Sequence, residues 1–476
     1  MKNKYIKHTL LIVCLFCISL LIGCQSEEKE AITVVPMEIE ESRGYSFDFI
    51  GGKDVMPIGG FYGPYTTGYS KNGNRLPDYV SDEIFELISD AGINLVVASS
   101  ENYSSRPERV LKALELGEKY GVGLFVSDNN ILRAIVSEAY PEEEIVNALI
   151  KYYDYESFCG VHLIDEPTTP YYMGGDYTRY ISTYGYLAQM LENSLGVTCY
   201  ENLLPVTNTK SAQESYEKYV EEFCETFNPK FLTWDHYIFD KSRGENYQMY
   251  FWNMDVIRQY SEKYDIPFWA FIQAGSQWAE GGLVEFDSET PYYPNEAQFN
   301  WNVNTSLAFG AQGIQYFPLI QPYHFAYGES TEWDCERNGV IGAFGNKTQW
   351  YNFAKNINKH IAEIDEVLMN SVNKGIIVSG TDAINDTART SYVIESGKFQ
   401  ELISVDGDAL IGCFNYNGKT ALYVVNYSME YAQHIVLEFN QKHDINMIQN
   451  AEKSYIKAEK LTLDMAAGEG VLLVIE

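Results

Sequence analysis

The sequence predicts a (β/α)8 barrel, the TIM-barrel fold, followed by a small C-terminal antiparallel β-sandwich, and three observations support this. An apolar, strand-like segment followed by an amphipathic helix recurs about every 35–40 residues between residues 54 and 371. Several of these segments are continuously apolar, as expected of parallel strands that are buried on both faces. From residue 372 onward the hydrophobic period changes to two, which is typical of antiparallel strands.

Eight strand–helix units can be counted in the first region. The predicted strands span residues 55–62, 94–99, 123–127, 159–167, 197–202, 231–235, 267–273 and 313–318. The predicted helices span residues 82–91, 107–120, 142–155, 177–194, 212–227, 248–264, 295–309 and 348–369. Capping and stop signals set the boundaries: Ser81 is an N-cap, Pro107 opens the second helix, and Gly92 and Gly121 end the first two.

Residues 372–476 form the predicted β-sandwich. Its strands are expected at residues 376–379, 409–415, 420–426, 434–439 and 470–475, and no helix is expected among them. Asn417-Gly418 lies between two of these strands and is a strong hairpin signal, because both residues tolerate a positive φ.

The N-terminus reads as a targeting segment. Lys2, Lys4 and Lys7 precede an apolar run that ends in Leu-Ile-Gly-Cys24, which resembles a bacterial lipobox. The resemblance implies a lipoprotein signal peptide over residues 1–23, fatty acylation (palmitate) of Cys24, and an acidic linker over residues 24–53. The protein is then expected to be lipid-anchored in a bacterial cell envelope, outside the cytoplasm, with the cell surface as one of the locations that this allows. A plain signal peptide or an uncleaved anchor is the alternative.

Charge and cysteine content exclude several classes of function. The formal net charge is −32, which disfavours binding to nucleic acid or to an anionic membrane surface and suits a neutral or cationic substrate. After Cys24, five widely spaced cysteines remain, so neither a disulfide framework nor a metal knuckle is indicated. We expect no metal and no cofactor.

The fourth predicted strand, Cys-Gly-Val-His-Leu-Ile-Asp-Glu-Pro, is the most informative stretch. Its apolar run ends in two adjacent carboxylates, Asp165 and Glu166, and Pro167 then stops the strand because proline has no amide hydrogen to donate. A (β/α)8 barrel presents its catalytic groups at such strand ends. The alternative is a helix start, with Asp165 as N-cap and Pro167 in the first turn.

The other strand ends supply further polar and aromatic residues. Together with the fourth strand they give Asp128, Asp165, Glu166, Glu201, Asp235, His236, Tyr237, Gln273, Trp278 and Tyr316, with Trp234 adjacent. Carboxylates beside aromatic platforms favour glycoside hydrolysis, in which one acid protonates the leaving oxygen and a second carboxylate attacks, activates water or stabilises positive charge.

The barrel resembles the large clan of retaining (β/α)8 glycoside hydrolases, clan A, and looks most like members that carry Asp-Glu-Pro at the end of strand four. Residues 308–317 and 345–350 are similar to the clan's passages into and after strand eight. The resemblance implies that Glu166 is the general acid/base and that the substrate is a carbohydrate.

The chain departs from this clan at strand seven, where the clan's nucleophilic glutamate is replaced by Gln273. Three possibilities remain. Asp235 is the nucleophile or stabiliser and Glu166 the acid/base. Alternatively, Asp165 and Glu166 act together with Tyr237 on a 2-acetamido sugar whose own oxygen attacks, as in glycoside hydrolase families 20 and 123. In the third case the site binds sugar without catalysis.

We therefore predict a glycosidase acting on oligo- or polysaccharides, and a non-catalytic surface glycan-binding lipoprotein is the alternative. The predicted catalytic residues are Glu166, Asp235 and Asp165. The predicted substrate-binding residues are Glu201, Trp234, Tyr237, Gln273, Trp278, Tyr316 and Asp128. A peptidase or esterase lacks support, because neither Gly-x-Ser-x-Gly nor His-Glu-x-x-His occurs.

Overall fold

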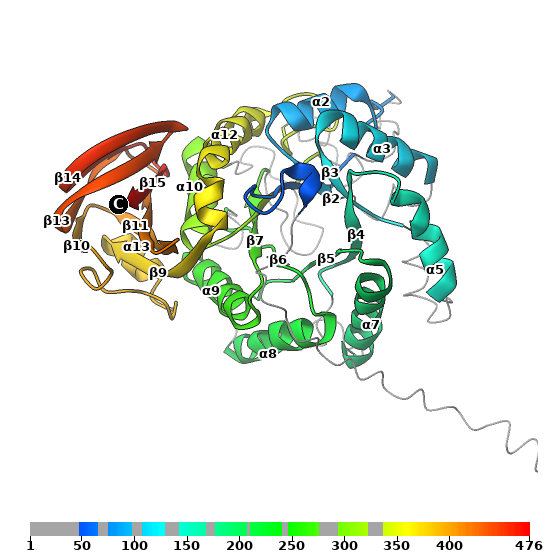
Figure 1. Cartoon of the computed structure of the whole chain (residues 1–476), viewed down its shortest axis with the longest axis horizontal. Helices are drawn as coiled ribbons and strands as arrows, with labels where there is room; N and C mark the ends of the chain where they lie inside the picture. The colour runs from blue at the N-terminus through cyan, green and yellow to red at the C-terminus, as the bar shows by residue number, and fades with distance from the viewer. Residues whose placement is uncertain are drawn as a thin grey trace, which may run out of the picture.

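The structure is a computed structural model, shown in Figure 1. It describes residues 47–64, 75–97, 107–128, 142–167, 177–206, 210–239, 246–275, 294–321 and 337–476. Within these ranges, none of the helices combines the length and the apolar composition that crossing a membrane requires.

Eight parallel strands form the predicted barrel. They are β1 (Ile58–Phe61), β2 (Leu95–Val97), β3 (Gly123–Val126), β4 (Phe158–Asp165), β5 (Cys199–Asn202), β6 (Leu232–Trp234), β7 (Phe268–Gln273) and β8 (Ile314–Phe317). Their hydrogen-bonded order is β5-β4-β3-β2-β1-β8-β7-β6. A parallel bridge between Leu203 and Trp234 joins the two ends, so the sheet closes on itself. The (β/α)8 prediction is confirmed.

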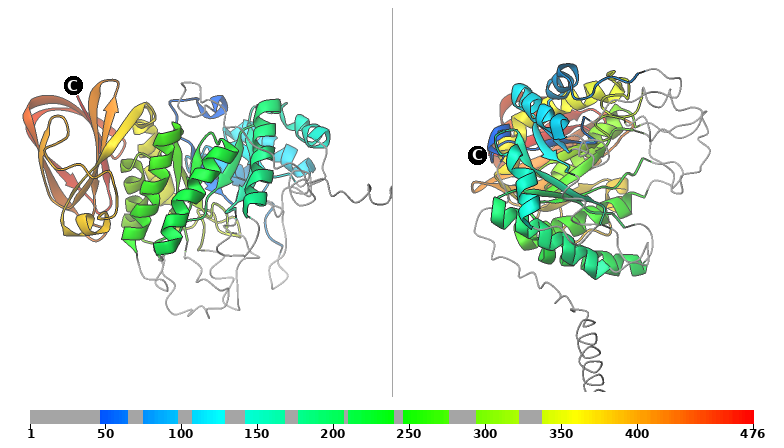
Figure 2. Two further views of the ribbon diagram at one scale, coloured as in Figure 1. Left: turned by 90° about the horizontal axis from the view of Figure 1, so that it is seen from below. Right: turned by 90° about the vertical axis from the view of Figure 1, so that its right-hand side faces the viewer.

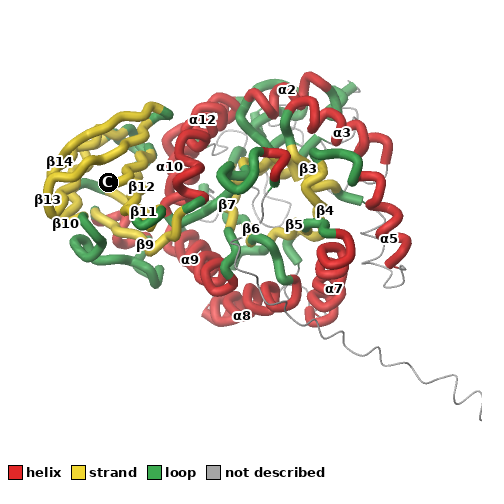
Figure 3. The backbone as a smooth tube through the Cα atoms, viewed as in Figure 1, coloured by secondary structure: helices red, strands yellow, loops and turns green. Residues whose placement is uncertain are grey.

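A ring of helices surrounds this sheet (Figures 1 and 3). They are α2 (Asp82–Asp90), α3 (Pro107–Tyr120), α5 (Glu142–Leu149), α7 (Tyr177–Leu195), α8 (Lys210–Phe227), α9 (Tyr247–Tyr264), α10 (Glu296–Ala308) and α12 (Gln349–Met369). Gly92 and Gly121 follow α2 and α3 with positive φ, as their predicted role as helix stops requires. The third helix is shorter than predicted, because a 3₁₀ turn, η2 (Ile150–Tyr152), follows Leu149 directly.

The barrel interior is filled mainly by aromatic rings. This inner cluster includes Phe61, Phe125, Tyr200, Phe231, Trp269 and Phe271. Phe47, the residue before the 3₁₀ turn η1 (Asp48–Ile50), packs against it. Phe231 and Trp269 stack with centroids 4.2 Å apart. Alternate strand residues face outward and pack beneath the helices. This alternation decides which residues at the strand ends can reach the barrel axis.

The C-terminal unit is a strongly curved antiparallel sheet around its own core, as predicted (Figure 2). Its strands are β9 (Ser371–Ser379), β10 (Leu402–Asp406), β11 (Ala409–Tyr416), β12 (Lys419–Asn426), β13 (Gln433–Gln449), β14 (Glu452–Met465) and β15 (Gly470–Ile475). The hairpin at Asn417-Gly418 is confirmed, with both residues at positive φ. Three elements were not predicted: β10, β14 and the short helix α13 (Thr381–Asp386). Much of β14 is exposed and polar, which hides its period of two.

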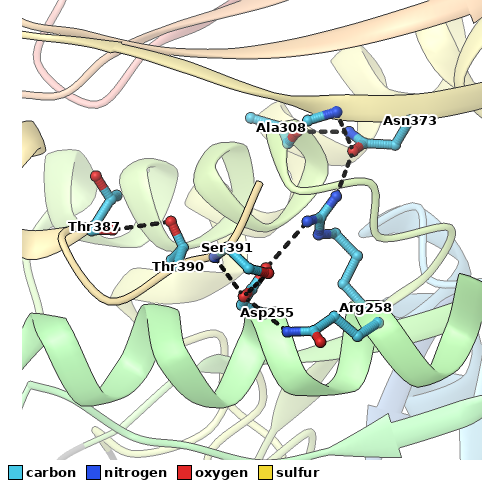
Figure 4. A network of polar contacts seen from close by, with 9 residues as sticks. Asp255, Arg258, Ala308, Asn373, Thr387, Thr390 and Ser391 are labelled. Carbon is cyan, nitrogen blue, oxygen red and sulfur yellow. Dashed lines mark hydrogen bonds and ion pairs between the residues drawn. The ribbon is translucent and has the colours of Figure 1, made fainter. Parts of the chain in front are cut away.

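The sandwich packs beside α10 and α12, at one side of the barrel (Figure 1). A partly buried polar network joins it to α9 (Figure 4). The Arg258 guanidinium donates to Asp255 at 3.1 Å and to Asn373 at 3.2 Å, and it lies 3.3 Å from the centroid of the Tyr392 ring. Asp255 also accepts from the backbone and the hydroxyl of Ser391, both at 2.8 Å. The two domains are therefore tied together through a helix of the barrel.

Candidate active site

The end of β4 brings two carboxylates to the mouth of the barrel. The backbone nitrogen of Glu166 donates to the carbonyl of Asn202 at 2.9 Å, which continues the pairing with β5. Glu166 itself has a φ of +44°, in the left-handed region that is costly for a residue with a side chain. Register shifts between β4 and its neighbours on both sides precede this turn. The irregular strand end therefore aims the Asp165-Glu166 pair, and the alternative of a helix start at Asp165 is wrong.

Asp235 follows β6 and meets the β4 carboxylates. Its side chain is buried and forms a hydrogen bond with that of Glu166. The side-chain nitrogen of Asn202, at the end of β5, lies 3.2 Å from Oδ1 of Asp165 and 3.2 Å from Oδ1 of Asp235. The ends of β4 and β6 thus form one group, which we call the carboxyl cluster (Asp165, Glu166 and Asp235), and Asn202 at the end of β5 bridges two of its members.

Burial and mutual repulsion keep protons on the carboxyl cluster. Loss of hydration, and then the charge of Glu166, raise the pKa of Asp165 to about 7, although this side chain still reaches solvent at the mouth. Burial raises the pKa of Glu166. Burial, followed by the charges of Glu166 and Asp165, raises the pKa of Asp235 well above its ordinary value. A hydrogen-bonded pair of carboxyls shares a proton, because two charges in contact repel.

Tyr237 lies beside the carboxyl cluster. Its half-buried ring packs on Phe317, with centroids 5.2 Å apart, and meets Phe271 edge-on at 6.3 Å. Burial, and then the neighbouring charges of Asp235 and Glu166, raise the pKa of the phenol well above its ordinary value. A neutral phenol beside carboxylates is a hydrogen-bond donor toward whatever occupies the mouth.

Gln273 ends β7, as predicted, but its amide is committed to the backbone. Its nitrogen donates to the carbonyls of Phe239 and Gly275, each at 3.0 Å, and its oxygen accepts from the nitrogen of Phe239 at 3.1 Å. The side chain is buried. It therefore fastens the loop after β6, which begins at Asp235, to the end of β7.

Four further predicted substrate-binding residues lie away from the carboxyl cluster. Glu201, Trp234 and Tyr316 are buried on the outward side of their strands, where the phenol of Tyr316 donates to Asn358 at 2.5 Å. The carboxylate of Asp128 accepts from Tyr152 at 2.7 Å and lies 3.7 Å from Lys151. All four alternate with inward-facing neighbours along the strand, so the barrel turns them toward the helices.

Asn202 is the residue of this site that the sequence analysis missed. It follows Glu201 directly, and an amide does not titrate, so its chemistry does not mark it as an acid–base group. The available signal was the period of two along β5, since Tyr200 faces inward and Asn202 therefore shares its side. Two predicted residues, Trp278 and Cys24, lie outside the described residues.

The part of the chain that the structure describes contains no group of three or more His, Cys, Asp or Glu side chains arranged to hold a metal ion. That the protein needs no cofactor stays a prediction.

Comparison with known proteins places the fold. No family model matches the chain, and no curated protein sequence is similar to it. Among solved structures, it is similar to a β-galactosidase from Bacillus circulans sp. alkalophilus, with a TM-score of 0.55 over 89% of this chain and 99% of the other, at 9% identity. The fold is one that glycoside hydrolases use.

Two weaker matches carry similar descriptions. A glycoside hydrolase family 5 protein from Bacteroides vulgatus has a TM-score of 0.49, with 92% of this chain and 95% of the other covered at 12% identity. A maltogenic α-amylase from Thermotoga neapolitana has a TM-score of 0.46, with 89% and 99% covered at 10% identity.

Proposed function

We propose that this protein is a glycoside hydrolase that cleaves O-glycosidic bonds of oligo- or polysaccharides, with Glu166 as the general acid and then the general base. The observation that carries the proposal is the contact between Glu166 and Asp235 at the mouth of the barrel. This pair offers one proton and one negative charge in a site that water only partly reaches. The proton is needed to protonate the leaving oxygen, and the negative charge is needed to stabilise the oxocarbenium-like transition state.

Asp235 is the preferred second carboxylate. Its carboxyl contacts that of Glu166 directly, whereas the two carboxyls stand about 5–5.5 Å apart in retaining enzymes and about 6.5–9.5 Å apart in inverting ones. A sugar entering between the two carboxyls must therefore separate them, which breaks the shared hydrogen bond and leaves the proton on one partner. Catalytic contacts commonly reach their working geometry only with substrate bound.

Two alternatives have specific support. Asp165 is next to Glu166 and Tyr237 is close by, which is the arrangement that a substrate-assisted reaction on a 2-acetamido sugar uses. Against any catalysis stands Gln273, since its amide replaces the strand-seven carboxylate of the clan and is fully occupied by backbone groups. That observation favours the non-catalytic glycan-binding protein.

The first test is hydrolysis of an aryl-glycoside panel that includes plain hexosides and 2-acetamido hexosides. We expect Glu166→Gln to reduce kcat/KM by about 10²–10⁴-fold, the usual contribution of general acid–base catalysis. Glu192→Gln is the matched control, because Glu192 is another poorly exposed glutamate whose pKa is raised, to about 7, but it lies on α7 outside the carboxyl cluster. It should retain full activity.

The panel also separates the mechanisms. Turnover confined to 2-acetamido sugars, with little loss in Asp235→Asn, favours the Asp165–Glu166 pair. Turnover of plain hexosides that Asp235→Asn abolishes favours Asp235. Absence of hydrolysis on both small and polymeric substrates, together with polysaccharide binding that survives Glu166→Gln, would replace the enzyme with the binding protein.

We further propose that Cys24 is lipidated and anchors the protein in the bacterial cell envelope, outside the cytoplasm. Stable anchoring of this kind uses more than one acyl chain. Metabolic labelling with a palmitate analogue should mark the full chain and fail to mark Cys24→Ala. Equal labelling of both would contradict the assignment.

A further inference from the structure

Asn202 has an unusual position in the site, because one amide group serves two carboxylates. Its nitrogen lies 3.2 Å from an oxygen of Asp165 and 3.2 Å from an oxygen of Asp235. An amide nitrogen has two hydrogens, so each carboxylate receives one. The reverse orientation would set the amide oxygen against two acceptors, so the surroundings determine which way the amide points.

The layer beneath holds this amide in place. The hydroxyl of Thr233, on β6, lies 3.2 Å from Oδ1 of Asn202 and 2.6 Å from the carbonyl of Glu201. Asn202 is 2% exposed, and Thr233 is equally buried. The amide oxygen of Asn202 is thus held by Thr233 inside the barrel, and both N–H donors of the amide point toward the carboxylates at the mouth. Residues from β4, β5 and β6 meet at this one group.

We infer that Asn202 is a positioning residue that clamps Asp165 and Asp235 beside Glu166 and stabilises both as carboxylates. The role of this clamp in catalysis rests on the proposed function, whereas its effect on the titration of the two aspartates does not. The clamp fixes two of the three carboxyls in space and stabilises their ionised forms, since a hydrogen bond donated to a carboxylate favours the charged state.

The rest of the cluster's surroundings act in the opposite direction. The phenols of Tyr200, Tyr216, Tyr219 and Tyr237 face it from β5, α8 and the loop after β6, and burial raises the pKa of each. They carry no positive charge that could stabilise the carboxylates. Burial raises the pKa of all three carboxyls, and the charges of neighbouring carboxylates further raise the pKa of Asp165 and Asp235. Asn202 lowers the pKa of Asp165 and Asp235 against this trend.

The number of protons matters because glycoside hydrolysis needs an acid and a carboxylate together. With Asn202 present, the pKa of Asp165 is about 7, so this carboxyl still carries part of its negative charge at neutral pH. Without the two donors of Asn202, the pKa of Asp165 would be higher and the carboxyl would hold a proton at pH 7. The cluster would then be short of the negative charge that stabilises the transition state.

The test is a titration of the carboxyl groups in the full chain, labelled with ¹³C in aspartate side chains and followed by NMR. Asn202→Leu removes both donors at similar volume. We expect the apparent pKa values of the two cluster aspartates, identified by their absence in Asp165→Asn and Asp235→Asn, to rise by at least about one unit. Asn358→Leu is the control: this buried amide contacts a tyrosine and a backbone carbonyl but no carboxylate, so the titration should be unchanged.

Unfolding is checked by circular dichroism, and Asn202→Ser is the second variant if Asn202→Leu does not fold. Shifts below about 0.3 units in a folded variant would overturn the inference. Where a substrate is found, the pH optimum of kcat/KM should move upward by a similar amount. If the pKa values shift in Asn202→Leu but the wild type hydrolyses no substrate, the clamp is upheld and the proposed function is rejected. If the wild type hydrolyses a substrate but the pKa values do not shift, the proposed function stands and the clamp is rejected.

Discussion

Glu166 is held in a backbone conformation that few residues with side chains adopt. Its φ of +44° places it in the left-handed region, at a cost of about 1–3 kcal/mol. The backbone hydrogen bond to Asn202 and the stop at Pro167 hold the turn in place. Such strain is typical of residues whose side chain must point in one particular direction. Here that direction is toward Asp235.

A single substitution at Gln273 tests whether its amide is held by the backbone. Gln273→Glu restores the residue type of the clan's nucleophile, but its new carboxylate would face the carbonyls of Phe239 and Gly275. We expect destabilisation of about 1–3 kcal/mol, larger at pH 8 than at pH 5 because only the ionised form repels both carbonyls. Urea unfolding at the two pH values measures this.

The matched control is Gln298→Glu, the same substitution in the capping box at the start of α10. There a negative charge lies near a helix N-terminus, so stability should be unchanged or slightly higher. A Gln273→Glu protein as stable as the wild type at pH 8 would show that the side chain is free to turn into the mouth.

Helix α9 connects the sandwich to the candidate site. Asp255 and Arg258 form the partly buried network with Asn373 and Ser391. Two residues before Asp255, Asn253 bonds the backbone of Val206 through both its oxygen and its nitrogen, each at 3.0 Å. Val206 lies in the loop that follows β5. The sandwich thus supports the helix that fastens the loop next to the carboxyl cluster.

We predict that Asp255→Ala destabilises the protein by about 3–5 kcal/mol, because it leaves the buried Arg258 charge without its partner. Lys263→Ala on the same helix removes an exposed ion pair with Glu221 and should cost no more than about 1 kcal/mol. Thermal unfolding of both variants measures the difference. Equal shifts would mean that the network contributes no more than an ordinary surface pair.

The whole molecule is acidic, and several of its carboxyls are buried. Burial raises the pKa of Asp165, Glu166, Glu192, Glu201 and Asp235. A raised folded-state pKa means that the folded protein binds more protons than the unfolded chain between the two values, so stability falls as pH rises through that window. The pKa of Asp90 is instead lowered to about 2, which would make stability rise with pH. Because Asp90 is exposed, solvent screens its contribution to the pH dependence of stability.

We therefore predict a higher thermal midpoint at pH 5 than at pH 8. Glu192 alone, with a pKa of about 7 against 4.5, accounts for up to about 3 kcal/mol of this loss. Glu192→Gln should shrink the difference between the two pH values. An unchanged difference would show that Glu192 is ionised in the folded protein at both.

Short-range sequence signals were sufficient to predict most of the architecture. Continuous apolar segments, glycines such as Gly92 that end helices, and the Asn417-Gly418 turn all act within a few residues, and the barrel, its helices and the hairpin follow from them. The Asp-Glu-Pro end of strand four was visible for the same reason. By contrast, β14 was missed because its first half is largely exposed and polar, which hides the period of two, and α13 was missed because a helix of 6 residues shows too little of a helical period.

The composition of the site was decided by tertiary structure. Glu201 and Asn202 are adjacent, yet the closure of the barrel turns the carboxylate toward the helices and the amide toward the axis. Nothing local marks that choice, since a shift of one residue in strand register reverses it. The sequence by itself therefore determined the barrel, the sandwich and the paired carboxylates of β4. Only long-range contacts decided that Asp235 meets Glu166, that Asn202 joins Asp165 to Asp235, and that burial leaves protons on the cluster.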